Sequence, residues 1–105
     1  MSPPVRFAPE ASAELEDAVR WYEERRHGLG LAFLAAVANA VDLVTHWPET
    51  GEVVADLASN VDVRRVPVRR FPYHLAYLAT EDVLHVLAVA HDRRRPAYWS
   101  GRVEA

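Results

Sequence analysis

The sequence predicts an α+β fold, β-αα-βββ, in which a helical hairpin packs on a small, mainly antiparallel sheet. Residues 9–45 carry apolar side chains at helical spacing, with one interruption at Gly28–Gly30. Residues 61–90 instead hold short runs rich in Val, Leu and Tyr, separated by turn residues. A length of 105 residues is typical of one domain, which we expect to span residues 1–105.

The first strand and the first helix are expected within the first 27 residues. Val5–Phe7 is a short apolar run that suits a strand. Pro9 fits the first turn of a helix, where no backbone N–H is required, and the acidic Glu10 and Glu14 suit the positive end of the helix dipole. The apolar stripe of this helix consists of Ala11, Leu15, Ala18 and Tyr22. Gly28 ends the helix, which is expected over residues 9–27.

A second helix is expected from Gly30 to Thr45. Its apolar positions Leu34, Val37, Val41 and Val44 repeat every three or four residues, and we expect the first three of them in the core between helix and sheet. The link between the helices is very short, so the two form an antiparallel hairpin. Pro48 and Gly51 end the second helix, and Asp56–Asn60 is expected to be a loop.

Three strands are expected in the second half of the chain. The first, Val61–Val68, contains an Arg-Arg doublet and Pro67, which lacks an N–H; both features predict a bulge or an edge position. Tyr73–Leu78 is expected to form the second strand. Val83–Ala90 is apolar on both faces except at His85, which is typical of a central strand.

Composition excludes several classes of function. The chain has no Cys, which rules out disulfides, thiol catalysis and Cys-based metal sites. The P-loop and dinucleotide fingerprints are absent and no helix carries metal ligands at suitable spacing, so we expect no cofactor and no metal. A net charge of −3 argues against a free-standing nucleic-acid binder. The N-terminus has no long apolar run, so we expect no signal peptide, no membrane span and a cytoplasmic location.

The charges are divided unevenly along the chain, and every basic residue is Arg. The first sixty residues hold four Arg and ten acids, whereas residues 61–105 hold eight Arg and five acids. A fold that keeps these regions apart has one basic pole, which suits an anion or an acidic partner. The arginines of this pole are Arg64, Arg65, Arg69, Arg70, Arg93, Arg94, Arg95 and Arg102.

Three segments together resemble the RelE/ParE superfamily of bacterial type II toxins, often called plasmid stabilisation proteins. They are FAPEASAELEDAVRWYEERRHGLG in the first helix and turn, RRVPVRRFPYHLAY across the strands, and LAVAHDRRRPAYW at the end. The resemblance covers nearly the whole chain. It implies a toxin that a cognate antitoxin holds inactive and that stops growth when freed. One branch of the superfamily cleaves mRNA on the ribosome, and the other poisons DNA gyrase without being a nuclease.

The leading hypothesis is a ParE-like toxin that interferes with DNA gyrase through its Arg-rich sheet edge and tail. The expected target-binding residues are Arg65, Arg69, Arg70, His74, Arg93, Arg94, Arg95 and Trp99. The resemblance implies an antitoxin segment that wraps the helices and can extend the sheet. Its expected contacts are Trp21, Arg64 and Arg65, because an added strand would find both backbone groups and charge at the Arg doublet.

The alternative is a RelE-like, ribosome-dependent mRNA endonuclease that works without metal. Such an enzyme needs a base, cations that stabilise the phosphorane, and an acid. The catalytic residues would be His91, Arg93 and Tyr98. The chain departs from the RelE-like set, because Arg65 and Pro67 stand near the usual second-strand lysines and His74 stands where an Arg is common. A third alternative is a degenerate member that keeps antitoxin binding but is not toxic.

Several candidate residues also have a purely structural interpretation. His91 ends a strand, where its ring would hydrogen-bond a backbone carbonyl. Tyr98 and Trp99 directly follow an Arg-rich, Pro-containing segment and would pin the tail to the sheet. Trp21 lies at the margin of an apolar stripe, where it would either cover the core or anchor an antitoxin helix.

Overall fold

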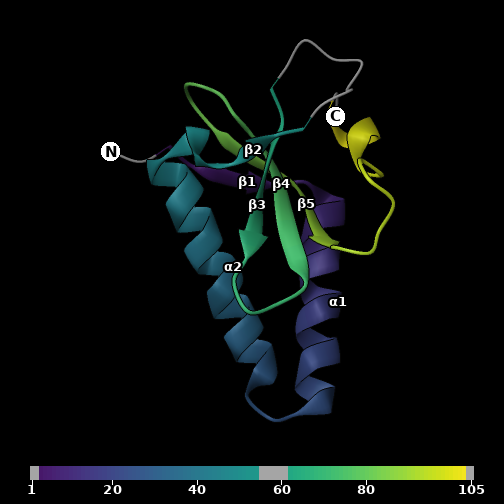
Figure 1. Ribbon diagram of the computed structural model, residues 1–105. Coiled ribbons are helices and arrows are strands. Elements are labelled where there is room, and N and C mark those ends of the chain that lie inside the picture. The colour runs from purple at the N-terminus through teal and green to yellow at the C-terminus, as the bar shows by residue number, and fades with distance from the viewer. Residues whose placement is uncertain (1–2, 55–61, 104–105) are drawn as a thin grey trace.

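The computed structural model describes residues 3–54 and 62–103, and it confirms the α+β fold with a helical hairpin on a sheet (Figure 1). The loop expected at residues 56–60 lies outside the described residues. The elements in chain order are β1 (Val5–Phe7), α1 (Pro9–Arg25), α2 (Leu29–His46), the 3₁₀ turn η1 (Pro48–Thr50), β2 (Glu52–Val53), β3 (Arg64–Val68), β4 (Tyr73–Ala79), β5 (Leu84–His91) and the 3₁₀ turn η2 (Ser100–Arg102).

The five strands form one sheet in the order β1-β5-β4-β3-β2. Strand β1 runs parallel to β5, and all other pairs are antiparallel, as predicted for a mainly antiparallel sheet. The two-residue strand β2 was not predicted, because two residues carry no detectable period. It pairs with Arg64 and Arg65, so the edge expected at this doublet is covered. The edge prediction holds further along β3, since among the described residues Pro67 has only His74 beside it.

The sheet contains a bulge in β5, where none was predicted. Ala76 lies opposite Ala88 but Tyr77 lies opposite Val86, so Leu87 is the extra residue. A regular strand would place Leu84 and Val89 on opposite faces, because they are an odd number of residues apart. Both instead reach the core beneath the helices, because the bulge resets the alternation.

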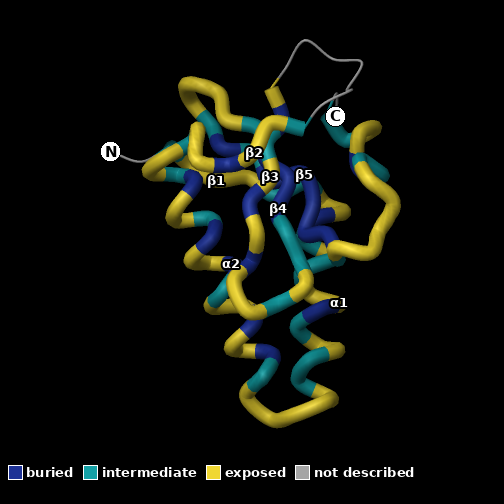
Figure 2. The backbone as a smooth tube through the Cα atoms, in the orientation of Figure 1, coloured by how far each residue is buried: buried dark blue, intermediate teal, exposed yellow. Residues whose placement is uncertain are grey.

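The main core lies between the helices and one face of the sheet, and Figure 2 shows its buried strands. On α2 the buried stripe consists of Gly30, Phe33, Val37, Ala40 and Val44. The prediction that Leu34 lies in this core is wrong, because Leu34 is 40% exposed whereas Phe33 is fully buried. Apolar residues surround α2 almost entirely, so two helical phases fit its sequence. The aromatic rings of Tyr22, Phe71 and Tyr73 select the phase by packing on Phe33.

The turn between the helices is set by two glycines and one carboxylate. Gly28 has a φ of 88°, a left-handed conformation that favours glycine. A Cβ on Gly30 would lie 2.7 Å from the carbonyl oxygen of Val19, so only glycine permits this close crossing of the helices. The Glu23 carboxylate accepts the N–H groups of Gly28 and Gly30, and these hydrogen bonds lower the pKa of Glu23.

A second, smaller core lies on the other face of the sheet, where the C-terminal tail covers it. Trp99 is only 2% exposed and packs there with Val63, Ala76, Leu87, Ala88 and Ala90. Helix α2 is long and apolar enough to cross a membrane by length and composition alone. Its buried stripe, which is 28% of that segment, packs in the main core.

Candidate partner-binding site

One carboxylate, that of Glu14 in α1, anchors the C-terminal tail. Its Oε2 accepts the Tyr98 hydroxyl at 2.6 Å and Arg102 Nη2 at 3.2 Å. Its Oε1 accepts Arg102 Nη1 at 2.9 Å and the backbone N–H of Val89 at 3.1 Å. Arg102 Nη1 also donates to the carbonyl oxygen of Leu87 at 3.0 Å. These residues, which we call the Glu14 clip, fasten the tail to α1 and β5 together.

The hydrogen bonds of the clip are strengthened because its side chains are largely buried. The Glu14 and Arg102 side chains are only 19% and 16% exposed, and the guanidinium engages both carboxylate oxygens. The sequence analysis missed this role of Glu14, although one signal was present. Glu14 lies three residues after Ala11 and four before Ala18, both of which are buried, so its carboxylate had to find a partner.

Tyr98 belongs to the clip, which confirms the prediction that it pins the tail. Burial and, secondarily, the hydrogen bond to Glu14 raise the pKa of Tyr98 to about 12. The Arg94 guanidinium lies 4.0 Å from the centre of the Tyr98 ring, at a distance typical of a cation–π contact. A hydroxyl with this pKa and a fixed acceptor is a poor proton donor near neutral pH.

His91 ends β5 in a half-buried position. Its Nδ1 accepts the backbone N–H of Arg93 at 3.1 Å, so in a neutral ring Nε2 carries the proton. The ring also lies edge-on to Tyr73, with the centroids 5.1 Å apart. The predicted bond to a backbone carbonyl is therefore wrong: this nitrogen accepts from an N–H instead. The hydrogen bond from the Arg93 N–H to His91 stabilises the turn that begins the tail.

The predicted catalytic residues come together only in part. His91 and Tyr98 line one cavity of about 510 Å³ between α1 and the tail, together with Arg94. The exposed Arg93 does not line it. Trp21 lines the same cavity, is 49% exposed and carries the Arg25 guanidinium 3.9 Å from its ring centre. Trp21 also packs edge-on against Tyr22, which packs on the main core, so it covers that core in part and leaves about half of its surface exposed.

The predicted target-binding residues lie in three different places. Arg65 and His74 lie on the tail-covered side of the sheet, where the His74 Nδ1 lies 2.9 Å from Asp92 Oδ1. The arginines at 93–95 form an exposed turn after β5. Arg69 and Arg70 lie at the β3–β4 hairpin, where they line a groove beside α2. The sequence treated all of them as a single pole, and the structure divides it.

Two predicted contact residues have structural roles. Trp99 is buried in the second core, so it is not a surface that a target can reach. Arg64 donates to the carbonyl oxygens of Glu49 and Gly51 at 3.1 and 2.8 Å, and thus holds the segment between α2 and β2. Arg65 is exposed but its backbone pairs with Glu52 on one side and Ala76 on the other, so a further strand cannot add at this residue.

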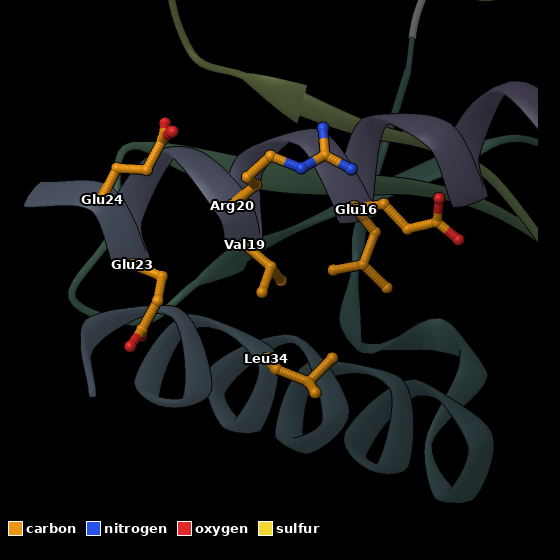
Figure 3. Close-up of a pocket in the computed structure, with 7 residues that line it drawn as sticks. Glu16, Val19, Arg20, Glu23, Glu24 and Leu34 are labelled. Atoms are coloured by element: carbon orange, nitrogen blue, oxygen red, sulfur yellow. The ribbon is translucent and has the colours of Figure 1, made fainter. Parts of the chain in front are cut away.

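The outer side of the helical hairpin offers an apolar surface with an acidic rim. Figure 3 shows Val19 of α1 and Leu34 of α2 pointing toward one another, with Glu16, Arg20 and Glu24 along α1. This cavity of about 560 Å³ adjoins another of about 490 Å³, and both are lined by Leu15 and Leu34. We call the two together the hairpin groove. It suits an apolar segment that carries positive charge.

The structure thus combines a helical hairpin, a five-stranded sheet and exposed arginines in its turns. The comparisons place it in a family. The chain belongs to the ParE toxins of type II toxin–antitoxin systems of the parDE kind, matching that family over residues 5–96. Its fold is similar to a chain from the chromosomal ParDE system of P. aeruginosa, with 13% identity, a TM-score of 0.69 and coverage of 86% of this chain and 96% of the other. No curated protein matches the chain in sequence.

Proposed function

We propose that this toxin inhibits growth by binding DNA gyrase in the bacterial cytoplasm and performs no bond-breaking chemistry of its own. The single observation that supports this proposal most is the Glu14 clip. The residue expected to act as a catalytic acid, Tyr98, uses its hydroxyl to hold the tail and has a pKa near 12. His91 likewise has one ring nitrogen engaged by the backbone of Arg93. These two contacts support a tail that presents arginines over one that transfers protons.

The partner that silences the toxin is a cognate antitoxin, as membership of the family implies. We propose that the antitoxin covers the hairpin groove, because exposed Leu34 and the apolar Leu15 and Val19 need a partner of matching chemistry. Its acidic rim, which includes Glu16 and Glu24, would attract basic side chains of the antitoxin. Contacts at Trp21 and at the exposed side chain of Arg65 remain part of this proposal, without strand addition at Arg65, whereas Arg64 is assigned to internal hydrogen bonds.

The alternative mechanism is mRNA cleavage on the ribosome, and the experiment described below tests it together with the gyrase proposal. One observation favours it: His91, Arg94 and Tyr98 line a single cavity. Under this alternative, His91→Gln and Tyr98→Phe should each slow cleavage by ~10²–10⁴-fold, as loss of acid–base groups does. Under our proposal His91→Gln should leave growth inhibition nearly intact, because Gln still accepts the Arg93 N–H.

The experiment is induced expression without antitoxin, with gyrase supercoiling and mapping of mRNA 5′ ends followed in parallel. Loss of supercoiling or DNA breaks with intact mRNA would support the gyrase proposal. Codon-periodic mRNA cuts with normal supercoiling would overturn it. Absence of any growth defect would identify a degenerate toxin that keeps only antitoxin binding. Truncation after Ala90 is unsuitable here, because it removes the buried Trp99 along with the arginines.

A further inference from the structure

A groove lies between α2 and the β3–β4 hairpin, which run side by side in Figure 1. Its volume is about 880 Å³. We call it the α2–β3 groove. The lining residues used in the argument are Arg26, Ala35, Asn39, Arg69, Arg70 and Phe71. None of the functions proposed above uses it.

The charge of this groove sets it apart from the three cavities described above. Each of those is lined by at least one carboxylate, such as Glu16, Glu14 or Asp42. Among the residues that the structure describes, three arginines and no acid line the α2–β3 groove. Within residues 3–54 and 62–103, Arg26, Arg69 and Arg70 make no ion pair, whereas Arg20 and Arg102 do. In a chain of net charge −3, three unneutralised guanidiniums around one groove mark a site for an anion.

The backbone of the β3–β4 hairpin holds one of these arginines, Arg70, in an unfavourable conformation. Arg70 has a φ of 75°, in the left-handed region where Gly or Asn is the usual choice. A non-glycine residue in this conformation stores about 1 kcal/mol or more of strain and is a pointer to function. The turn presents Arg69 and Arg70 in sequence at the mouth of the groove, and Arg26 approaches from the end of α1.

The shape of the groove indicates a polypeptide ligand. Its lining runs along α2 from Leu29 to Leu43, which at about 1.5 Å per residue is roughly 21 Å. An extended segment of about six residues has that length. Four alanines and Phe71 are among its lining residues, so small or medium apolar side chains fit between the charges. The net charge of −3 disfavours a nucleic-acid polyanion, which would need a more basic domain.

The sheet edge beside the groove adds a second means of binding. Strand β2 covers only Arg64 and Arg65, and Pro67 lines the groove. Among the described residues, no strand lies on the outer side of β3 from Val66 to Val68. An extended ligand in the groove therefore passes along a free strand edge.

We propose that the α2–β3 groove binds an extended segment of the toxin's target protein in which acidic residues alternate with apolar ones. The carboxylates of this segment pair with Arg26, Arg69 and Arg70, and its apolar side chains pack against the lining alanines. The inference rests on the proposed function, since it requires a protein target. It assigns target binding to Arg26, which its position directly after α1 did not suggest. It also places the target and the antitoxin at two different sites, since the antitoxin is proposed to cover the hairpin groove.

The test uses the full-length toxin and two fluorescein-labelled peptides of about eight residues, one alternating Glu and Leu and the other alternating Lys and Leu. The Glu–Leu peptide should bind, and its addition should shift the amide signals of Ala35, Asn39 and Phe71 in a ¹⁵N spectrum. Arg26→Gln combined with Arg69→Gln should weaken binding by about tenfold or more, because charge-assisted hydrogen bonds are lost. Ala35→Glu should do the same by repulsion.

Arg6→Gln is the matched control, since it removes the same charge from exposed Arg6 on β1, at the opposite edge of the sheet. It should leave peptide binding unchanged. Absence of binding by the Glu–Leu peptide, equal binding of the Lys–Leu peptide, or shifts confined to the His91–Tyr98 cavity would each overturn the proposal.

A second readout separates this proposal from the function on which it rests. The Arg26→Gln/Arg69→Gln variant should lose growth inhibition yet still co-purify with the antitoxin. Full toxicity of this variant would overturn the groove proposal while the toxin function stands. If the wild-type protein proves non-toxic, the proposed function fails, and the peptide titration still decides whether the groove binds acidic segments.

Discussion

The two faces of the sheet are covered in physically different ways. The helices cover one face by apolar packing, in which the rings of Tyr22, Phe33, Phe71 and Tyr73 form one cluster. The tail covers the other face with one large apolar side chain, Trp99, and with the Glu14 clip. Apolar packing is non-directional and spreads over many atoms, whereas the clip depends on one carboxylate. The tail can therefore be released by a change that leaves the helical face intact.

The largest expected effect comes from the helix-covered face. Phe33→Ala should lower the free energy of unfolding by about 3–5 kcal/mol, because a fully buried ring that touches three other aromatic rings leaves a cavity. Chemical denaturation followed by tryptophan fluorescence measures this change. Both faces should melt together, since the sheet is common to both.

The matched control is the neighbouring residue on the same helix. Leu34→Ala should cost less than about 1 kcal/mol, because Leu34 is 40% exposed in the hairpin groove. A loss equal to that of Phe33→Ala would mean that α2 is rotated from the orientation described above. Leu34→Ala should instead weaken antitoxin binding if the hairpin groove is the antitoxin site.

A smaller effect, confined to the tail, is expected from the clip. Glu14→Ala leaves the Arg102 guanidinium and the Tyr98 hydroxyl without their acceptor. Loss of one partner of a buried ion pair costs about 3–5 kcal/mol, and the partial exposure of this pair reduces the expectation to about 2–3 kcal/mol. Hydrogen exchange should accelerate in residues 97–103 and remain slow in the helical hairpin.

The control for the clip is Glu16→Ala, which removes a carboxylate from the exposed side of the same helix. It should change stability by less than about 0.5 kcal/mol and leave exchange in the tail unaltered. Equal acceleration of exchange in the helical hairpin and in the tail of Glu14→Ala would contradict the independence of the two faces.

The smallest effect is a pH dependence that the tail-covered face contributes through Tyr98. The pKa of Tyr98 is raised from 10.0 to about 12, first by burial and then by the hydrogen bond to Glu14. The folded state thus favours the protonated phenol. Its contribution to stability is complete below pH 10, where the unfolded chain is also protonated, and is lost as the pH rises toward 12.

This dependence is measured as the difference in unfolding free energy between wild type and Tyr98→Phe across that window. Burial also raises the pKa of Tyr22, Tyr73 and Tyr77, so both proteins should lose stability at high pH. The wild type should lose more. Identical slopes for the two proteins would show that the tail is not held through the protonated Tyr98 hydroxyl.

The elements of this fold were predictable because their signals are local. The apolar period and the glycines at the turn placed α1 and α2 within two residues of their observed ends. The runs of β-forming residues placed β4 and β5 within one residue. The resemblance carried by three segments gave the family, which the match over residues 5–96 confirms. Each of these signals lies within a few residues of the structure that it specifies.

The remaining features depend on contacts that no local pattern records. Glu14 meets Val89, Tyr98 and Arg102 across 75, 84 and 88 residues of chain. The orientation of α2, with Phe33 inward and Leu34 outward, depends on rings from the β3–β4 region. The arginines form one pole in the sequence, but the hairpin carries Arg69 and Arg70 to α2 while the clip holds Arg94 beside α1. The amino-acid order determined which residues are cationic and which segments are helical, whereas only the tertiary packing decided which cations share a surface.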